Sequence, residues 1–419
     1  MDARTETPGS GPLAGLRAVE LGSTVAGPFC ARLLADFGAD VIKLEQIDGD
    51  AVRSMGKRKD GRSLYAASIL RGKRIVSLDL RAAEGQALAR RFCETADILV
   101  ENFKPGALER WDLGYDALSK ANPGLVLVRI SGFGQDGPYA RKPGYGVVCE
   151  AVSGLREITG DPDRPPPRVA TSLTDYIAGL YGAFGAVMAI LDRHRTGRGQ
   201  VVDTALYEGS FSFMEPHIPA FQQLGHIAQR AGPRLPDNTP NNLYPTRDGR
   251  HIQIVAITNR HFGRLLEAMG QSGLADDPRV STPVARSANA DAVDGMIADW
   301  TRAHDLTELE RLLDAAGLPS ARIYTVADIF ADPHFRDREM LVDVEDETLG
   351  TVTVPGIVPK LSANPGVVRW AGRGNGDDTR AVLASELGLS DAEIEDLARA
   401  GVVAGRGLPE AEAADRGAA

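Results

Sequence analysis

The feature that most constrains the fold is a long helical pattern in the middle of the chain, between Arg168 and Leu206. Large apolar residues recur there at steps of three and four, which places them on one stripe of a helix. They are Ile177, Leu180, Tyr181, Phe184, Val187, Met188 and Leu191. Ser172 or Thr174 suits the N-cap, and Gly197 is expected to end the helix. The sequence therefore predicts one long central helix.

A second stripe of this helix is made of small residues. It contains Ala178, Gly182, Gly185, Ala186 and Ala189, with Gly179 beside it. Glycine destabilises a helix interior by about 0.5–1 kcal/mol relative to alanine. Three glycines within seven residues therefore indicate that another part of the protein packs very close to this helix.

Asp175 is the ionisable residue in the expected first turn of this helix. Acidic residues are common in a first turn because the free N–H groups and the helix dipole stabilise them. The same N–H groups can also hold an aspartate ionised and aimed at a substrate, as a nucleophilic carboxylate requires. The spacing of residues leaves both interpretations open.

The first part of the chain alternates strands and helices. The pattern predicts strands at 16–21, 40–44, 74–78, 98–100 and 125–130, with helices at 28–37 and 82–93 between them. Consecutive βαβ units of this kind build a parallel sheet. We therefore expect an α/β protein whose large domain is Rossmann-like and begins at about residue 13.

The residue composition and periodicity of the sequence change after Leu206. Residues 211–239 are expected to form a linker that starts helical and becomes rich in Pro, Gly and Asn. A hairpin signal at 243–256 and helical patterns at 260–269, 290–303 and 306–315 predict a small α/β domain over 240–330. Strands near 342–344 and 350–354 and helices at 378–386 and 391–400 follow, in a segment 331–403. Residues 1–12 and 404–419 lack periodicity and are expected to be disordered.

Composition excludes several classes of function. The net charge of −10 argues against nucleic acid or an anionic membrane as partner. No apolar run reaches the roughly 18 residues of a membrane span, and the N-terminus lacks the apolar segment of a secretory signal. The three cysteines and seven histidines show no spacing typical of a metal site or disulfide framework. A cytoplasmic enzyme without a bound metal is the expectation.

A dense group of basic residues lies between Asp50 and Arg81, although the whole chain is acidic. A solvated surface is the usual meaning of such a run, but phosphate groups are an alternative because Arg and Lys neutralise them well. The turn after the first strand has Gly22 and Gly27 separated by four residues, so it does not fit the GxGxxG dinucleotide pattern. A nicotinamide or flavin enzyme is therefore disfavoured.

The chain resembles the family III CoA-transferases, also called the CaiB/BaiF family, over about residues 13–403. The resemblance rests on several motifs: Ala26-Gly27-Pro28, 34–45 (LADFGADVIKLE), Gly49-Asp50, Gly72-Lys73-Arg74, 100–106 (VENFKPG), Ser131-Gly132-Phe133-Gly134, Gly144-Tyr145 and 199–203 (GQVVD). Lys360-Leu361-Ser362 and Gly388-Leu389-Ser390 fit near the end. The motifs are specific for the family and say little about the substrate.

The resemblance implies a fold, a nucleophile and a coenzyme site. The C-terminal part would rejoin the N-terminal part to complete the large domain, and two chains would interlock as a homodimer. The residue that matches the family nucleophile is Asp175. Candidate contacts to coenzyme A, which is a substrate here rather than a bound cofactor, are Arg53, Lys73, Arg74, Asn102, Lys104 and Arg110.

The implied reaction moves CoA from an acyl-CoA to a carboxylic acid through an aspartyl anhydride and an aspartyl-CoA thioester. An α-methylacyl-CoA racemase of the same fold is one alternative, but racemases carry Gly-His-Asp where this chain has Gly144-Tyr145-Gly146. No histidine occurs between Met1 and Asp192. A non-catalytic acyl-CoA-binding protein is another alternative, which the retained aspartate argues against.

The chain departs from the formyl-CoA transferases, which place a run of glycines over the aspartate. The corresponding region here, residues 235–243, has no glycine, so Asn238, Asn241 and Asn242 are candidate oxyanion donors. Arg168 lies seven residues before Asp175. It is expected to pair with the second carboxylate of a small dicarboxylate such as succinate, on the donor or acceptor side.

Overall fold

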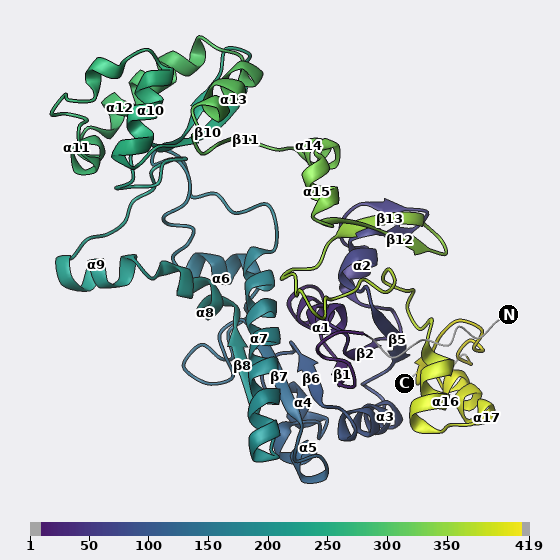
Figure 1. Ribbon diagram of the computed structural model, residues 1–419. Coiled ribbons are helices and arrows are strands. Elements are labelled where there is room, and N and C mark those ends of the chain that lie inside the picture. The colour runs from purple at the N-terminus through teal and green to yellow at the C-terminus, as the bar shows by residue number, and fades with distance from the viewer. Residues whose placement is uncertain (1–9, 413–419) are drawn as a thin grey trace. The chain divides into compact units, whose positions relative to one another are not determined.

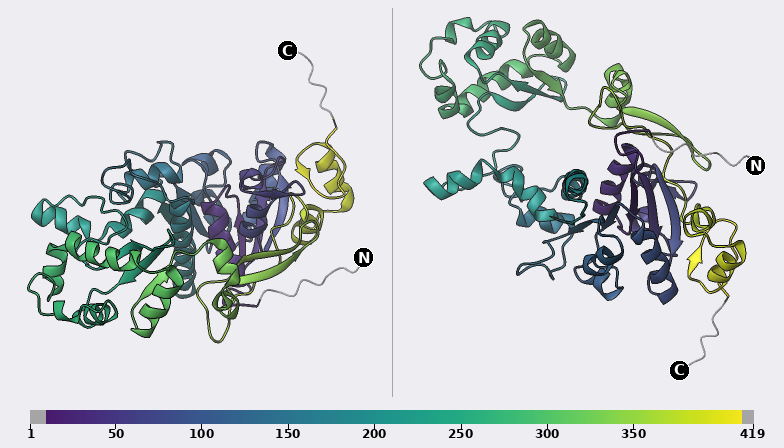
Figure 2. Two further views of the ribbon diagram at one scale, coloured as in Figure 1. Left: turned by 90° about the horizontal axis from the view of Figure 1, so that it is seen from above. Right: turned by 60° about the horizontal axis from the view of Figure 1, so that its bottom comes forward.

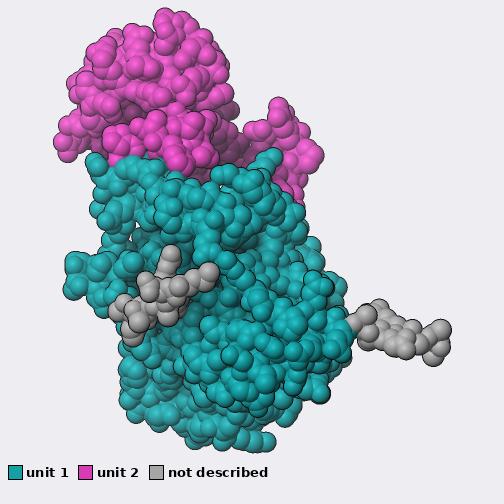
Figure 3. Space-filling view, turned by 90° about the vertical axis from the view of Figure 1, so that its right-hand side faces the viewer, with its two compact units in different colours: residues 1–155, 169–216, 334–419 teal, residues 156–168, 217–333 magenta. Residues whose placement is uncertain are grey.

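The computed structural model describes residues 10–412. Residues 1–9 of the predicted disordered N-terminus and residues 413–419 of the predicted disordered C-terminus lie outside the described residues. The chain divides into two compact units (Figure 3). Unit 1 contains residues 1–155, 169–216 and 334–419, and unit 2 contains residues 156–168 and 217–333. The predicted linker 211–239 is therefore split between the units, and segment 156–168, which the sequence assigned to the large domain, belongs to unit 2.

Unit 1 is built on a seven-stranded sheet with the order β14-β5-β2-β1-β6-β7-β8 (Figure 1). All neighbouring strands are parallel except β14, which pairs antiparallel with β5. The strands are β1 (Arg17–Glu20), β2 (Asp40–Glu45), β5 (Lys73–Leu78), β6 (Ile98–Glu101), β7 (Val126–Ser131), β8 (Val201–Ala205) and β14 (Val403–Ala404). The predicted α/β class is confirmed. Ala404 pairs with Ser77, so ordered structure continues past the predicted boundary at Val403.

Helices cover both faces of this sheet, as a parallel sheet requires (Figures 1 and 2). One face packs against α1 (Ala26–Asp36) and α7 (Leu173–Thr196). The other packs against α3 (Ala83–Glu94), α5 (Tyr115–Ala121), α16 (Thr379–Leu387) and α17 (Asp391–Arg399). Successive strand residues alternate between the faces: Ile98 faces α1 and α7, and Leu99 faces the other layer.

The long predicted helix is α7, and its small stripe is the buried one. An ideal Cβ on Gly179 would lie 2.8 Å from the Ala26 carbonyl oxygen, and one on Gly185 would lie 2.5 Å from Val202. The close approach expected from the glycines is therefore made by α1 and by β8. The large apolar residues face outward instead: Leu180, Phe184 and Leu191 are 57%, 59% and 57% exposed.

The remaining elements of unit 1 are short and lie around this frame. They are β3 (Arg58–Lys59), β4 (Arg62–Ser63), α2 (Leu64–Ile69), α4 (Ala107–Arg110), α6 (Gly146–Val152), α8 (Leu206–Phe211), β12 (Leu341–Asp346) and β13 (Gly350–Pro355), with 3-10 turns η1 (Ala51–Ser54) and η2 (Ser212–Met214). β12 and β13 confirm the two strands predicted near 342–344 and 350–354, and they pair as an antiparallel hairpin.

Unit 2 is a small α/β unit around the antiparallel sheet β11-β10-β9. Its core combines Tyr244, Ile252 and Ile254 of the sheet with apolar residues of the helices, such as Leu265 and Ile297. The elements are α9 (His217–Leu224), β9 (Asn241–Pro245), β10 (His251–Val255), α10 (Asn259–Ala268), η3 (Ser272–Leu274), α11 (Pro283–Ala288), α12 (Ala290–Arg302), α13 (Leu306–Ala315), β11 (Ser320–Arg322) and α14 (Val326–Ala331). The chain returns to unit 1 through α15 (Pro333–Asp337).

Candidate active site

The strand order of unit 1 creates a topological switch point beside β1. The chain builds β2 and β5 on one side of β1 and then β6, β7 and β8 on the other. In open α/β sheets, ligands bind outside the carboxyl ends of the strands at such a point. Here it lies between the loop 22–25, after β1, and the turn 102–106, after β6.

Asn102 joins these two segments. Its Oδ1 accepts a hydrogen bond from Ser23 N at 2.7 Å, and its Nδ2 donates to Ser23 O at 2.8 Å. Gly22 and Gly27 meet beside it, since an ideal Cβ on either would lie within 3.0 Å of the other's Cα. Gly22 and Gly27 do not form a dinucleotide motif, but their close packing explains why both positions are glycine. Asn102 is held at the switch point, where the sequence predicted a contact to CoA, and that contact stays a prediction.

Thr24 has a left-handed backbone, with φ of 72°, which is uncommon for a residue with a branched side chain. Asp50 supports it, because its Oδ1 accepts Thr24 N at 2.8 Å and Ser23 Oγ at 3.3 Å. The loop leads into α1, whose N-cap position, Val25, provides no side-chain hydrogen bond to the first turn. Free N–H groups at a helix start favour anions.

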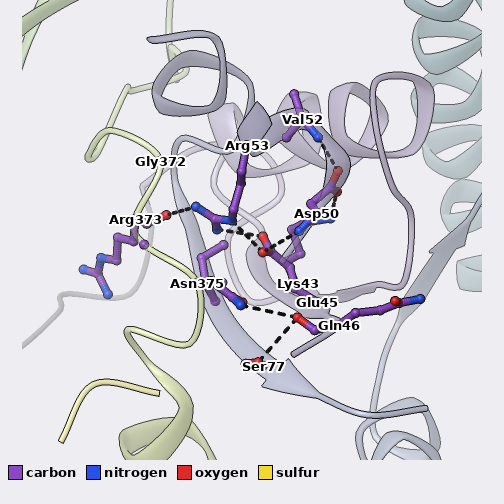
Figure 4. Close-up of polar contacts among 12 residues, drawn as sticks. Lys43, Glu45, Gln46, Asp50, Val52, Arg53, Ser77, Gly372, Arg373 and Asn375 are labelled. Carbon is purple, nitrogen blue, oxygen red and sulfur yellow. Dashed lines mark hydrogen bonds and ion pairs between the residues drawn. The ribbon is translucent and has the colours of Figure 1, made fainter. Parts of the chain in front are cut away.

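The Lys43 side chain is fully buried and contacts the backbone of this loop. Its Nζ lies 2.6 Å from Gly22 O and 2.8 Å from both Glu20 Oε1 and Asp50 Oδ2 (Figure 4 shows the Lys43–Asp50 pair). Burial alone would raise the pKa of Asp50, but the Lys43 ammonium outweighs it and lowers this pKa to about 2. The ion pair therefore stays charged at neutral pH.

The basic residues predicted to contact CoA fall into two groups: two are exposed, and the other three are paired with carboxylates of the protein. Lys104 and Arg110 are exposed at the turn after β6, and Lys104 makes no ion pair within residues 10–412. The Arg110 guanidinium donates to Gly106 O at 3.1 Å. Gly106 has a φ of 85°, which requires glycine at this turn. These two side chains and Asn102 are brought to the same end of the sheet.

Lys73 and Arg74 have carboxylate partners of their own. Lys73 is fully buried, and its Nζ lies 2.6 Å from Glu20 Oε2 and 2.7 Å from Pro28 O. Burial lowers its pKa to about 8. The Arg74 guanidinium contacts the carboxylates of Asp40 and Glu386. The contacts of both residues to CoA stay predictions, and the observed positions favour a structural role.

Arg53 is also paired, but it borders open space. Its guanidinium makes two hydrogen bonds to Glu45, at 2.7 and 2.8 Å, and one to Arg373 O at 2.9 Å (Figure 4). It lines a cavity of about 1210 Å³ in unit 1. Basic and acidic residues both line this cavity. The basic ones are Arg53, Arg58, Arg62, Arg373 and Arg406, and the acidic ones are Glu345, Asp346, Glu347, Asp377 and Asp378. The cavity therefore offers no excess of positive charge.

Asp175 lies in the first turn of α7, as predicted, and is half-buried. Its carboxylate sits against Gly146 at the start of α6. Its negative charge contributes to the raised pKa values of two neighbours, although burial is the larger cause: the Tyr65 pKa rises, and the Cys149 pKa rises to about 11. The Tyr65 hydroxyl is also 2.8 Å from that of Tyr176. Asp175 is thus placed among polar groups rather than in the apolar core.

A buried pair at the end of β6 was not identified from the sequence. Glu101 accepts from Arg129 Nε at 2.8 Å and from Phe103 N at 2.7 Å. Burial raises the pKa of Glu101 to about 7 even though Arg129 opposes the shift. The contact to Phe103 N fixes the turn that carries Asn102 and Lys104. The signal was the charged residue within an otherwise apolar strand, Ile98–Glu101.

The candidate oxyanion donors all belong to unit 2, where their amides have partners. Asn242 Nδ2 donates to Asp294, Asn241 Oδ1 accepts from Gln253, and Asn238 Nδ2 donates to Pro236 O. Arg168 also belongs to unit 2. Their roles toward substrate stay predictions. Within residues 10–412 no group of three or more metal-ligating side chains occurs.

A mostly parallel sheet with a structured switch point at the carboxyl ends of its strands defines a ligand-binding α/β protein of the Rossmann-like class. Residues 13–379 match the family model described as CoA-transferase family III. The chain belongs to this family and is an enzyme of the CoA-transferase class.

Two curated relatives come from Chloroflexus aurantiacus. Succinyl-CoA–D-citramalate CoA-transferase is 45% identical over 91% of this chain and 96% of its own length. The beta subunit of succinyl-CoA–L-malate CoA-transferase is 39% identical over 95% and 98%. A solved structure of a CaiB/BaiF family protein from Brucella suis has a TM-score of 0.81 and 33% identity, and it covers 90% of this chain and 100% of that chain.

One described helix, α7, is long and apolar enough to cross a membrane by length and composition alone. Its small stripe is buried against α1 and the sheet, with Ala178, Ala186 and Ala189 in the core of unit 1. This helix is accounted for by the fold of unit 1.

Proposed function

We propose that this enzyme transfers CoA from succinyl-CoA to a small dicarboxylic acid, with Asp175 as nucleophile. The observation that carries the proposal is the position of Asp175, half-buried in the first turn of α7 within unit 1. The substrate class is supported by the two curated relatives, whose names specify succinyl-CoA with citramalate or malate.

The chemistry needs neither ATP nor a resident cofactor, because one thioester replaces another. The Asp175 carboxylate attacks the succinyl thioester carbonyl, the C–S bond breaks, and CoA leaves as a thiolate. The thiolate then attacks the Asp175 acyl carbon of the mixed anhydride and releases succinate. The acceptor carboxylate attacks the resulting aspartyl-CoA thioester, the C–S bond breaks, and CoA thiolate is released again. The thiolate then attacks the acceptor acyl carbon of the new anhydride, which forms the product thioester and frees the Asp175 carboxylate.

The proposal assigns the switch point to the coenzyme. Lys104 and Arg110 would contact its phosphates, since they are exposed cations beside the turn 102–106. The uncapped start of α1 adds N–H groups at the same end of the sheet. The acceptor's second carboxylate would pair with Arg168. A cytoplasmic location is part of the proposal.

Asp175→Asn is the variant that tests the nucleophile. The amide is nearly the same size but far less nucleophilic, so we expect transferase activity to fall by a factor of at least ~10³, about 4 kcal/mol in transition-state stabilisation. The melting temperature and CoA binding should stay close to wild type. Borohydride or hydroxylamine trapping with succinyl-CoA should mark the peptide that contains Asp175.

Incubation with succinyl-CoA and labelled acids separates the transferase from its alternatives. A transferase moves label into a new thioester, a racemase exchanges the α-hydrogen of a 2-methylacyl-CoA, and a binding protein does neither. A variant Asp175→Asn that keeps substantial activity, or a trapped adduct elsewhere, would contradict the proposal. A panel of citramalate, malate and long-chain monocarboxylates identifies the acceptor, and reaction with the long-chain acids alone would exclude a dicarboxylate site.

We also propose a homodimer. The supporting observation is the outward stripe of α7, where Leu180, Phe184, Met188 and Leu191 are exposed together in the described chain. Contiguous apolar surface of this kind is typical of a protein interface. Light scattering should give twice the mass of the chain, and Phe184→Asp should reduce it. A monomeric wild-type protein would contradict this part of the proposal.

A further inference from the structure

Two glycine-containing motifs of unit 1 meet next to the candidate nucleophile. The first is Ser131-Gly132-Phe133-Gly134, at the end of β7, and the second is Gly144-Tyr145-Gly146, at the start of α6. An ideal Cβ on Gly144 would lie 2.7 Å from Gly132 Cα, and the reverse distance is also 2.7 Å. The two backbones are therefore packed directly on each other, with no room for a side chain at either position.

Cys149 strengthens this contact from the next turn of α6. Its Sγ is 3.2 Å from Gly132 O and is placed to donate a hydrogen bond to it. Cys149 is buried, and α6 lies against α7. The start of α6 is consequently held in place by β7 on one side and faces the first turn of α7 on the other.

Gly146 faces that first turn, and its neighbours differ in kind from those of Gly144. An ideal Cβ on Gly146 would lie 2.1 Å from Asp175 Oδ2, 3.1 Å from Asp175 Cγ and 2.7 Å from Thr174 Oγ1. Real Cβ atoms essentially never approach other atoms within 3.0 Å. The Asp175 carboxylate therefore occupies the volume that any side chain at position 146 would fill.

We propose that Gly146 is a positioning residue for the nucleophile: by lacking a side chain it lets the Asp175 carboxylate rest against the start of α6. This inference rests on the proposed role of Asp175. The backbone at Gly132 and Gly144 holds α6 in place, so a side chain at 146 displaces the carboxylate, which is the movable end of a side chain. A displacement of about 1 Å at a reacting group can cost 10²-fold in rate.

Gly146→Ala tests the proposal through a split between catalysis and binding. We expect kcat to fall at least ~100-fold, while the Kd for free CoA by calorimetry and the melting temperature stay close to wild type. The yield of trapped adduct on the Asp175 peptide should fall with kcat. Activity is expressed per mole of protein that binds CoA, so partial unfolding does not affect the comparison.

Two further glycine variants serve as controls. Gly144→Ala places a methyl group against backbone that cannot rotate away, so its melting temperature should fall clearly. Gly263→Ala, in α10 of unit 2, meets nothing within 4 Å and should keep full activity and stability. Together they show what backbone overlap and a harmless helix substitution do in this chain.

A Gly146→Ala enzyme with wild-type kcat would overturn the inference. So would a Gly146→Ala protein that melts as early as Gly144→Ala and no longer binds CoA, because the glycine would then be purely structural. Asp175→Asn separates this failure from that of the proposed function. If Asp175→Asn is inactive and Gly146→Ala is fully active, only the inference about Gly146 falls.

Discussion

Two sets of basic side chains in unit 1 have the same chemistry and opposite surroundings. The buried pair, Lys43 and Lys73, is fully enclosed, and both ammonium groups contact Glu20 within 2.8 Å. The rim pair, Lys104 and Arg110, is exposed at the turn after β6. Burial of a charge without partners is very costly, so the buried pair must be matched by carboxylates. The rim pair is free to meet a ligand's charge.

The largest effect expected from this difference is on stability at Lys73. Lys73→Met leaves one oxygen of Glu20 buried without its partner, and breaking a buried ion pair typically destabilises a protein by about 3–5 kcal/mol. Lys104→Met, the matched control on the rim, should change stability by no more than about 0.5 kcal/mol. Urea denaturation of the two variants measures both values.

Equal effects of Lys73→Met and Lys104→Met would break the comparison. The double variant Glu20→Gln/Lys73→Met sharpens the comparison. It removes both charges of the Lys73–Glu20 ion pair and so leaves neither of them uncompensated. It should recover part of the stability that Lys73→Met loses.

A smaller effect on stability is expected from Asp50, the carboxylate that pairs with Lys43. The pKa of Asp50 is lowered to about 2 in the folded protein, compared with about 3.9 in an unfolded chain. A depressed carboxyl pKa stabilises the fold above the unfolded value, and this contribution of about 2.6 kcal/mol is lost as the pH falls from about 4 through 2. Wild type should therefore lose more stability over that window than Asp50→Asn does.

Denaturation at several pH values between 6 and 2.5 checks this, with Asp299→Asn, at an exposed position of α12, as a control that should follow wild type. If Asp50→Asn and wild type lose stability in parallel, Asp50 does not hold a depressed pKa.

The smallest effect concerns the rim pair. Lys104→Ala or Arg110→Ala should weaken the binding of CoA by about 1.5 kcal/mol, roughly tenfold in Kd, since each would remove one charged contact to a phosphate. The wild-type affinity should fall as salt rises, and the variants should depend on salt less steeply. Calorimetry at two salt concentrations measures this. Unchanged affinity in both variants would remove the rim pair from the coenzyme site.

The sequence could not separate these two sets, and the reason is physical. Lys73 and Arg74 stand in a basic run, but their partners are Glu20, Asp40 and Glu386, which are distant along the chain. Only the sheet register, which aligns Glu20 with Lys43 across β1 and β2, brings such groups together. A dense run of positive charge in sequence therefore says little about which charges remain free.

The order of strands and helices in unit 1 was largely predictable, because its βαβ periods are regular. The position of Asp175 at the start of α7 was predictable from helix-capping signals and the resemblance. The antiparallel strand β14 and the parallel strand β8 were missed, since Val403–Ala404 is too short to show a period and Val201–Ala205 is half polar. The periodicity of α7 identified both stripes but not which one faces the core.

The origin of unit 1 in three separate chain segments has a consequence for its synthesis. When the ribosome has released residues up to 216, every strand of the large sheet except β14 exists. One face still lacks α16 and α17, which supply Val382, Leu383 and Ile394 to its core. Residues 217–333 emerge next and carry the whole core of unit 2. Unit 2 can thus finish folding before unit 1, because unit 1 is complete only when α16 and α17 have been synthesised.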